Sequence, residues 1–328
     1  MEQRAPQKLK LLKIWEILNE MTDKDHQMTT QQLIDELAKC DISTERRTVY
    51  RDLENLMQNG YDIQKGRLGH DNTYYVKNRR FNISEVKIIM DTVQSAAFIP
   101  KDKTALLLDK LADLSGKHRA ELLKQHTEQF LTVKHKNDNI YNNIEAIETA
   151  LENKQKIKFR YFHLNEHGEK VYAHDKKIYE EEPLGLIFED GNYYLLCYRA
   201  EANYLNNTKV FRLDRIDEPQ VLSEPVSPNA KALSQHVNNY RLQAFKMYGG
   251  AKRKVTFQFS PDLIEVVYDK FGHDTFIRRN DDVCRATVQV QISPTLWGWM
   301  LQFPTAMKIC EPADVKKQYY DWVRSALS

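Results

Sequence analysis

The chain has 328 residues, of which 41% are hydrophobic and 29% are charged, and its formal net charge is +2. This composition is typical of a globular protein with two or three domains, and no apolar run approaches the roughly 20 residues that a membrane-spanning helix needs. The four cysteines form no paired spacing, which argues against a disulfide framework or a zinc knuckle. We therefore expect a cytoplasmic protein with no membrane partner.

The first 80 residues predict three helices followed by two short strands. Apolar spacing places the helices at 8–21, 29–40 and 43–59, with Thr29 or Thr30 capping the second, Ser43 capping the third and Gly60 ending it. Strands are expected at 61–64 and 73–76, joined by a basic loop. This order is typical of a winged helix-turn-helix, which reads duplex DNA.

The polar side of the third predicted helix carries the candidate DNA contacts. Val49, Leu53 and Leu56 fall on its apolar side. The candidate DNA-binding residues of the helix and the loop are Thr44, Arg46, Arg47, Thr48, Tyr50, Arg51, Lys65 and Arg67. We expect Arg47 and Arg51 to reach guanine edges, and the threonines and tyrosine to contact phosphate or thymine methyl groups. Lys65 and Arg67 should follow the backbone or the minor groove. A merely solvated helix face is the alternative, but the clustering of positive charge favours DNA.

A helical connector is expected next. A further basic cluster, Lys77, Arg79 and Arg80, precedes it. Asn82 and Glu85 have the spacing of a capping box, which opens a leucine-rich helical region that extends to about Phe130. Such an apolar connector often carries a dimer contact.

Beyond residue 139 the pattern changes from helices to strands. One helix around 144–151 precedes strand-like runs at 156–162, 183–188, 192–199 and 209–216, which suggest a small, bent antiparallel sheet or barrel. Three prolines, at 219, 225 and 228, are expected to mark a linker. From residue 253 the predicted order is βαββαβ, the order of a ferredoxin-like sandwich.

Several motifs resemble those of the WYL-domain transcriptional regulators. The segment Gly191-Asn192-Tyr193-Tyr194-Leu195 resembles the triplet that names the family, with Tyr193 in place of its tryptophan. The segments Phe211–Ile216 and Glu182–Leu186 resemble two further signatures, although Glu180–Glu182 stands where relatives often carry a basic residue. The stretch RTVYRDLENL is similar to the helix-turn-helix of these proteins, and the segment with Trp299 and Glu311-Pro312 resembles their C-terminal extension.

The resemblance implies an α+β protein in four parts. These are a winged helix-turn-helix (1–80), a helical connector (81–138), a WYL domain with an Sm-like β-barrel (139–226) and a ferredoxin-like WCX-type domain (227–328). It also implies a homodimer that binds an inverted-repeat operator of double-stranded DNA and senses a nucleotide or oligonucleotide effector. Relatives include repressors beside phage-defence operons.

The candidate ligand site combines arginine forks, which suit phosphate, with tyrosines that can stack on bases. Its candidate residues are Tyr161, Tyr193, Tyr194, Arg199, Arg212 and Arg215. Strand alternation would place Arg212 and Arg215 on opposite faces, so both can line one pocket only if a bulge intervenes or one lies at the end of the strand. A structural pair between Arg212 and Asp214 is the competing interpretation for one of them.

No motif indicates catalysis or a bound metal. His163, His167 and His174 have no accompanying cysteine or second spaced pair, so a solvated loop is the preferred interpretation. The chain lacks a phosphate-cradling glycine loop, G-x-S-x-G and H-E-x-x-H. We therefore expect a regulator that is not an enzyme and uses no cofactor. The alternatives are a nucleic-acid-processing enzyme and an RNA-binding module that uses the Sm-like barrel.

Overall fold

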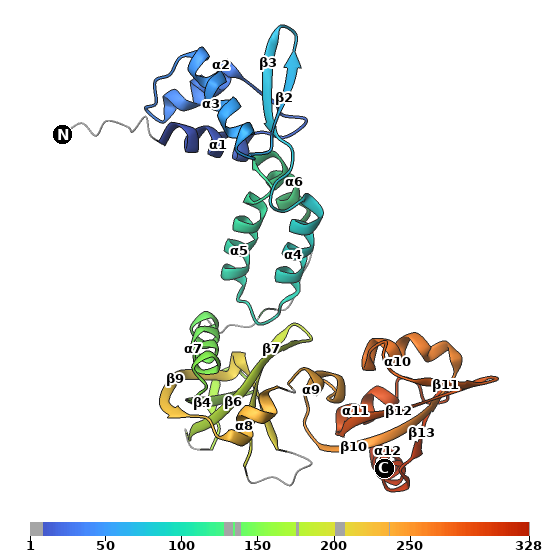
Figure 1. Ribbon diagram of the computed structural model, residues 1–328. Coiled ribbons are helices and arrows are strands. Elements are labelled where there is room, and N and C mark those ends of the chain that lie inside the picture. Colours follow the sequence, from blue (N-terminus) through green and yellow to red (C-terminus); the bar gives the residue numbers. More distant parts are fainter. Residues whose placement is uncertain are drawn as a thin grey trace. The chain divides into compact units, whose positions relative to one another are not determined.

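The computed structural model describes residues 9–127, 134, 139–174, 177–200, 207–235 and 237–327. The chain is α+β and divides into two compact units, Met1–Lys136 and Asn137–Ser328, which contain three antiparallel sheets among the described residues (Figure 1). None of the described helices is long and apolar enough to cross a membrane. The predicted helix start at Lys8, the predicted helical end near Phe130 and the predicted boundary after residue 138 lie outside the described residues.

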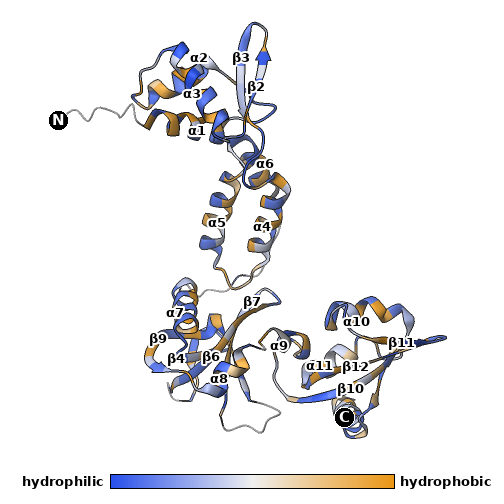
Figure 2. Ribbon diagram, viewed as in Figure 1, coloured by the Kyte–Doolittle hydropathy of each residue, from blue (hydrophilic) through white to orange (hydrophobic). Residues whose placement is uncertain are grey.

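The first unit begins with three helices and a hairpin, followed by three more helices. Its elements are α1 (Lys10–Met21), β1 (Met28–Thr29), α2 (Thr30–Lys39), α3 (Arg46–Gln58), β2 (Ile63–Leu68), β3 (Asp71–Val76), α4 (Ile83–Ser95), α5 (Lys101–Asp113) and α6 (Lys117–Thr127). Short strand β1 pairs with β3, which pairs with β2. Hydrophilic residues cover most of the hairpin, whereas apolar residues of α1, α2 and α3 face a common core and those of α4, α5 and α6 form a separate cluster (Figure 2).

Helix ends in this unit follow local capping chemistry. Thr29 and Gln32 form a capping box at the start of α2, and Asn82 and Glu85 form another at the start of α4. Gly60, with φ of +89°, follows the end of α3. The prediction that Ser43 caps α3 is wrong, because Glu45 occupies the N-cap position.

The second unit contains two sheets. Its elements are α7 (Ile140–Asn153), β4 (Gln155–Leu164), β5 (Lys170–Tyr172), β6 (Ile178–Glu189), β7 (Asn192–Tyr198), β8 (Thr208–Arg212), the 3-10 helix η2 (Leu213–Arg215), β9 (Ile216–Pro225), α8 (Pro228–Ser234), α9 (Val237–Gln243), β10 (Ala251–Phe259), the 3-10 helix η3 (Pro261–Leu263), α10 (Ile264–Phe271), β11 (Ile277–Asn280), β12 (Val283–Ile292), α11 (Pro294–Met300), β13 (Met307–Glu311) and α12 (Ala313–Leu327).

The first of these sheets is built around the long strand β4. Strands β5, β6 and β9 all pair with β4, and β7 and β8 continue the sheet beyond β6. Two predictions are wrong here. The run 209–216 is not one strand, because η2 separates β8 from β9. The proline-containing segment after it is not a linker, because Pro219 and Pro225 lie within β9. Only β4 pairs with β9 among the described strands, and such an edge position tolerates proline.

The second sheet has the order β11-β12-β10-β13 and the chain order βαββαβ. Its core includes Phe257 and Phe259 of β10 together with Trp297 and Met300 of α11. In chain order, α8 and α9 lie between the two sheets, and both helices pack against β6 of the first sheet. The packing of α9 on β6 is close, because a Cβ added at Gly185 of β6 would lie 2.9 Å from Cγ1 of Val237 in α9.

Candidate DNA-binding surface and ligand pocket

The outer face of α3 is the side opposite its buried residues. Val49, Leu53 and Leu56 pack into the core of the helices and hairpin. Arg47 and Arg51, one helical turn apart, are exposed. Within the described residues neither arginine has an ion-pair partner. Both guanidinium groups are therefore available to a phosphate or a base edge.

The two candidate threonines are placed differently from each other. Thr48 lies on α3 beside Arg47 and is partly exposed. Thr44 precedes the helix, which begins at Arg46, so the prediction that Thr44 projects from the helix surface is wrong. The chain there is extended at the N-cap, with φ of −98° and ψ of 151° at Glu45. A contact from Thr44 to DNA would come from the turn and not from the helix.

Arg46 and Tyr50 tie α3 to the hairpin. Nη2 of Arg46 lies 2.7 Å from Oδ1 of Asp71, and its Nε donates to the Tyr50 hydroxyl at 3.2 Å. The hydrogen bond to Asp71, with that to Tyr50, raises the pKa of Arg46. The predicted DNA contact by Arg46 thus competes with an ion pair inside the protein.

Lys65 and Arg67 lie on strand β2 and not in the predicted loop. The hairpin is longer than expected, with Lys65 opposite Tyr74 and Arg67 opposite Asn72, and it turns only at Gly69 and His70. Two residues apart on a strand, the two cations point to the same face. Both are exposed and have no ion-pair partner among the described residues.

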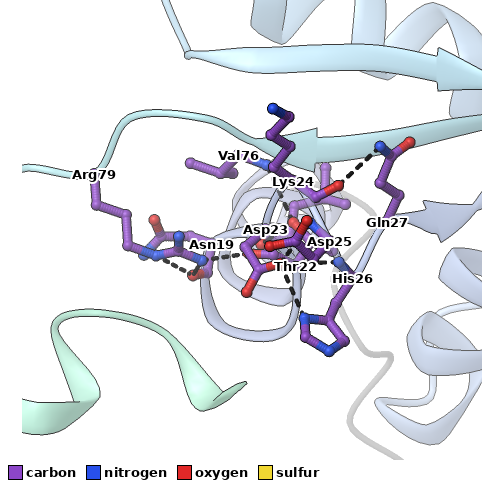
Figure 3. Close-up of polar contacts among 10 residues, drawn as sticks. Asn19, Thr22, Asp23, Lys24, Asp25, His26, Gln27, Val76 and Arg79 are labelled. Carbon is purple, nitrogen blue, oxygen red and sulfur yellow. Dashed lines mark hydrogen bonds and ion pairs between the residues drawn. The ribbon is translucent and has the colours of Figure 1, made fainter. Parts of the chain in front are cut away.

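Arg79 is half-buried, and its guanidinium ties the segment after β3 to the end of α1. Its guanidinium donates to the carbonyl oxygen of Asn19 at 2.7 and 3.1 Å and to that of Thr22 (Figure 3). Burial lowers the pKa of Arg79. Gly116, just before α6, lies so close that an added Cβ would be 2.5 Å from Nη2. This member of the basic cluster therefore points into the protein.

Asp23 organises the loop after α1. Its Oδ1 accepts hydrogen bonds from the backbone nitrogens of Asp25 and His26 at 2.9 and 2.8 Å, and it lies 2.9 Å from Nδ1 of His26 (Figure 3). Burial acts to raise the pKa of Asp23, but the hydrogen bonds from His26 outweigh it and hold the pKa below its ordinary value. The His26 ring also stacks on His118 of α6, with ring centroids 3.8 Å apart.

The second unit contains a cavity of about 610 Å³ beside β7, β8 and η2. It is lined by Tyr161, Tyr194, Arg199, Thr208, Lys209, Val210, Phe211, Arg212, Arg215, Tyr240, Lys246, Met247, Tyr248 and Gly249. Five of these lining residues are cationic and none is acidic. A cavity of this size can hold a nucleotide-sized ligand, and its charge suits an anion.

Arg212 and Arg215 both line this cavity, although strand alternation would have separated them. Arg212 is the last residue of β8, and Arg215 is the last residue of η2. The 3-10 helix replaces the alternation of a strand with a tighter turn, so residues three apart return to the same side. Arg212 lies at the end of its strand, which is one of the two arrangements expected to let Arg212 and Arg215 line the same pocket.

Two of the lining cations are paired with carboxylates. Nε and Nη2 of Arg212 each lie 3.0 Å from an oxygen of Asp214, and Lys209 lies 2.8 Å from Glu181. Burial alone would lower the pKa of Arg212, but Asp214 outweighs it and raises the pKa. Arg199 and Arg215 have no ion pair among the described residues. These two therefore have the greater capacity to bind a phosphate.

Two of the three candidate tyrosines line the cavity. The Tyr161 hydroxyl accepts a hydrogen bond from the backbone nitrogen of Arg212 at 3.2 Å. Burial raises the pKa of both Tyr161 and Tyr194, so both phenols stay neutral. Tyr193 does not line the cavity and instead packs against Phe188, with ring centroids 5.1 Å apart.

The sequence did not predict that the segment from Tyr240 to Gly249 contributes to the cavity. This segment contributes five lining residues, including Tyr240, Lys246 and Tyr248, yet it lies beyond the proline-rich stretch that was expected to end the sensing domain. The run Tyr248-Gly249-Gly250 was the available signal, because consecutive glycines often mark a turn.

The described residues contain no group of three histidine, cysteine or acidic side chains that could hold a metal ion. His167 is exposed in a turn, and the His163 ring packs edge-on against Tyr161 with centroids 5.5 Å apart. His163 thus packs on an aromatic ring and His167 lies at the surface, and neither position indicates a ligand.

Comparison with known proteins identifies one domain. A family model of the WYL domain matches residues 142–221, which run from α7 into β9. A solved structure of proteasome accessory factor B/C (PafBC) of Arthrobacter aurescens is 17% identical, with a TM-score of 0.29, over 99% of this chain and 50% of the other. The structure of a CRISPR Cas-related protein is 13% identical, with a TM-score of 0.37, over 98% of this chain and 80% of the other. This chain thus spans half the length of the Arthrobacter protein. No curated protein sequence matches the chain.

Proposed function

The chain contains a WYL domain at residues 142–221, and we propose from it that the protein is a sequence-specific DNA-binding transcriptional regulator. It acts in the cytoplasm as a repressor, and a nucleotide or oligonucleotide bound in the WYL domain sets its affinity for DNA. Its targets include a phage-defence operon. It uses no cofactor and catalyses no reaction.

The proposal assigns a fold to each part of the chain. The first 80 residues form a winged helix-turn-helix, in which α3 is the recognition helix and the β2–β3 hairpin is the wing. Residues 81–138 form the connector. Residues 139–226 form an Sm-like barrel, an assignment supported by the helix α7 before the six-stranded antiparallel sheet of β4 to β9. Residues 227–328 form a WCX-type ferredoxin-like domain, supported by the strand order β11-β12-β10-β13.

The observation that carries the DNA-binding proposal is the outer face of α3. Arg47 and Arg51 are exposed, lie on one face and have no ion pair among the described residues. Lys65 and Arg67 add a second basic surface on the hairpin. A helix in the major groove and a hairpin beside it would use these two surfaces for base and phosphate contacts respectively.

The cavity supports an anionic effector. Arg199 and Arg215 can offer guanidinium forks to phosphate, and Tyr161 and Tyr194 offer neutral rings for a base. The volume of about 610 Å³ would accommodate roughly a dinucleotide. An effector that bound one arrangement of the chain better than another would change the affinity for DNA.

A homodimer is part of the proposal. Exposed apolar side chains lie on each of the connector helices, with Ile88 66% exposed on α4, Leu106 62% on α5 and Leu122 52% on α6. A second copy of the chain could cover them. Two-fold symmetry would then require an inverted-repeat operator, with half-sites about 34–36 Å or a multiple of that apart.

Three binding and activity assays with the full chain test this function. Gel shifts with the DNA upstream of its own gene should show sequence-specific complexes that pTpT or another short oligonucleotide alters. A nuclease assay with added Mg²⁺ or Mn²⁺ should show no cleavage, and single-stranded RNA should bind more weakly than the operator. Cleavage of nucleic acid would favour the processing enzyme, and preferential RNA binding would favour the RNA-binding module.

A further inference from the structure

A strained turn carries Lys246 into the cavity. The chain between α9 and β10 reverses at Phe245–Tyr248, where the Tyr248 nitrogen donates to the Phe245 carbonyl at 3.1 Å. Lys246 and Met247 both have left-handed backbone angles, with φ of +48° and +59°. Turns with two such residues favour asparagine and glycine. A lysine and a methionine hold this conformation only if the surroundings impose it.

The C-terminal domain holds one side of the turn. Oγ1 of Thr295 donates to the Phe245 carbonyl at 2.7 Å, and Nζ of Lys270 donates to the Ala244 carbonyl at 2.7 Å. The Lys270 ammonium also lies 4.4 Å from the centre of the Phe245 ring. Phe245 itself belongs to the hydrophobic core of the C-terminal domain.

The chain leaves the turn under a similar constraint. An added Cβ at Gly250 would lie 1.9 Å from the carbonyl oxygen of Ile292, so only glycine fits against β12 there. The Gly250 nitrogen donates to Oε1 of Gln291 at 3.0 Å. Both ends of the turn are therefore fixed to the C-terminal domain.

The sensing domain holds the other side. Met247 is buried and belongs to the same hydrophobic cluster as Leu184, Leu196 and Tyr240. One short turn thus places neighbouring residues in the cores of two domains. Lys246, between Phe245 and Met247, and Tyr248, after Met247, line the cavity, and Lys246 has no ion pair among the described residues.

We propose that Lys246 contacts the phosphate of the bound ligand and that its turn reports occupancy of the cavity to the C-terminal domain. The residue lies outside the WYL match at 142–221, so the C-terminal part of the chain completes the site. A ligand that attracts Lys246 acts on the same backbone that Thr295 and Lys270 hold. The inference rests on the proposed function only in requiring that the cavity bind an anion.

Calorimetric titration of the full chain with inorganic pyrophosphate and with the dinucleotide pTpT tests the contact. Lys246→Ala should weaken binding of both by about tenfold or more, because a hydrogen bond to a charged group is lost. Lys246→Arg should bind almost as tightly as the parent. Lys231→Ala, which removes an exposed lysine of α8 away from the cavity, serves as the control and should change nothing.

Hydrogen exchange tests the transmission. In the parent, pTpT should slow exchange of the Tyr248 and Gly250 amides. Thr295→Val removes the hydroxyl that bonds the Phe245 carbonyl and should abolish most of this slowing, whereas Thr295→Ser should restore it. Thr275→Val is the matched control, because it removes a hydroxyl that bonds the carbonyl of Phe271 in the same domain at 3.1 Å.

The outcomes separate this inference from the proposed function. If the parent binds neither probe, both are overturned. If the parent binds and Lys246→Ala binds equally well, the proposed pocket stands and this inference falls. If Lys246→Ala binds weakly but the ligand leaves the two amides unchanged, Lys246 is a ligand contact without a reporting role. Losses of both binding and slowing, each rescued by the conservative variant, support the inference in full.

Discussion

Arg47 and Arg51 on α3 differ from Lys65 on β2 in what they can contact on DNA. The proposed base contacts of the arginines predict that Arg47→Ala or Arg51→Ala costs about 1–3 kcal/mol of specific binding. Lys65→Ala should weaken binding to all sequences similarly and reduce the salt dependence by about one counterion, because a lysine on the hairpin neutralises phosphate. Fluorescence anisotropy with operator and random duplexes at several salt concentrations measures both effects.

The matched control for these variants is Lys110→Ala, which removes an exposed positive charge from α5. It should leave specific binding and the salt slope unchanged. Equal, sequence-independent losses from Arg47→Ala, Arg51→Ala and Lys65→Ala would contradict the assignment of base contacts to α3.

Asp23 predicts a pH dependence of stability. Its pKa is lowered in the folded chain from the ordinary value of 3.8, so the unfolded chain binds its proton first as pH falls. The stabilisation is therefore complete above the ordinary pKa and is lost as pH falls through the lower folded value. Asp23→Asn should lower the free energy of unfolding near neutral pH and flatten its fall in acid. Urea denaturation between pH 3 and 7 is the measurement, and Asp25→Asn, an exposed neighbour, should leave the profile unchanged.

At the residue scale the chemistry of the cavity was more predictable than its geometry. Five of the six candidate residues line it, because arginine and tyrosine near strand ends are a local signal. Tyr193 does not line the cavity, since alternation along β7 turns it away from Tyr194. Lys246 was missed because its approach to the cavity depends on a distant turn, which local pattern does not encode.

At the scale of elements, Arg79 predicts a link between the end of α1 and the start of α6, because it bonds the end of α1 and packs against Gly116 just before α6. Arg79→Met keeps much of the apolar stem but leaves the carbonyl oxygens of Asn19 and Thr22 without their donor, which should cost about 1.5–3 kcal/mol. Amides of α6 should then exchange faster, as measured by mass spectrometry. Arg80→Met removes an exposed neighbouring charge and should leave α6 unchanged. Identical exchange in both variants would exclude the link.

Helices were predicted more accurately than strands. Capping residues such as Thr29 and Asn82 act within four residues, so their signal is visible in the sequence. Strand ends depend on pairing with distant partners. The hairpin therefore extends through Lys65 and Arg67, and β9 includes Pro219 because its outer edge needs no further partner.

At the scale of the whole molecule, the exposed apolar residues of the connector predict its role in dimerisation. Ile88→Glu or Leu106→Glu should weaken the dimer by at least about tenfold, because a charge would be buried in the interface. Light scattering and sedimentation over a range of concentrations measure this. Leu164→Glu, which alters a residue 59% exposed on β4, is the control and should leave the dimer intact. Unchanged association in all three variants would exclude the connector as the interface.

The order of helices and strands along the chain was predictable, because each shift from helical to strand spacing is visible locally. The predicted end of the sensing domain at residue 226 does not coincide with the end of its hydrophobic cluster. Its hydrophobic cluster has nine buried residues, and five of them, from Val226 to Met247, lie beyond the WYL match. The packing of α8 and α9 on the sheet is long-range and has no local signature.

This shared cluster limits how the proposed sensing domain could be exchanged between related proteins. A segment transplanted at residue 226 would leave four of the nine buried residues of this cluster behind (Ala230, Tyr240, Ala244 and Met247) and expose Leu184 and Leu196 to water. We expect a fragment of residues 139–249 to unfold cooperatively on heating and a fragment of 139–226 to aggregate, as circular dichroism and light scattering would show. Ligand preference would then be inherited together with the beginning of the C-terminal domain, so recombination that changes one has to carry part of the other.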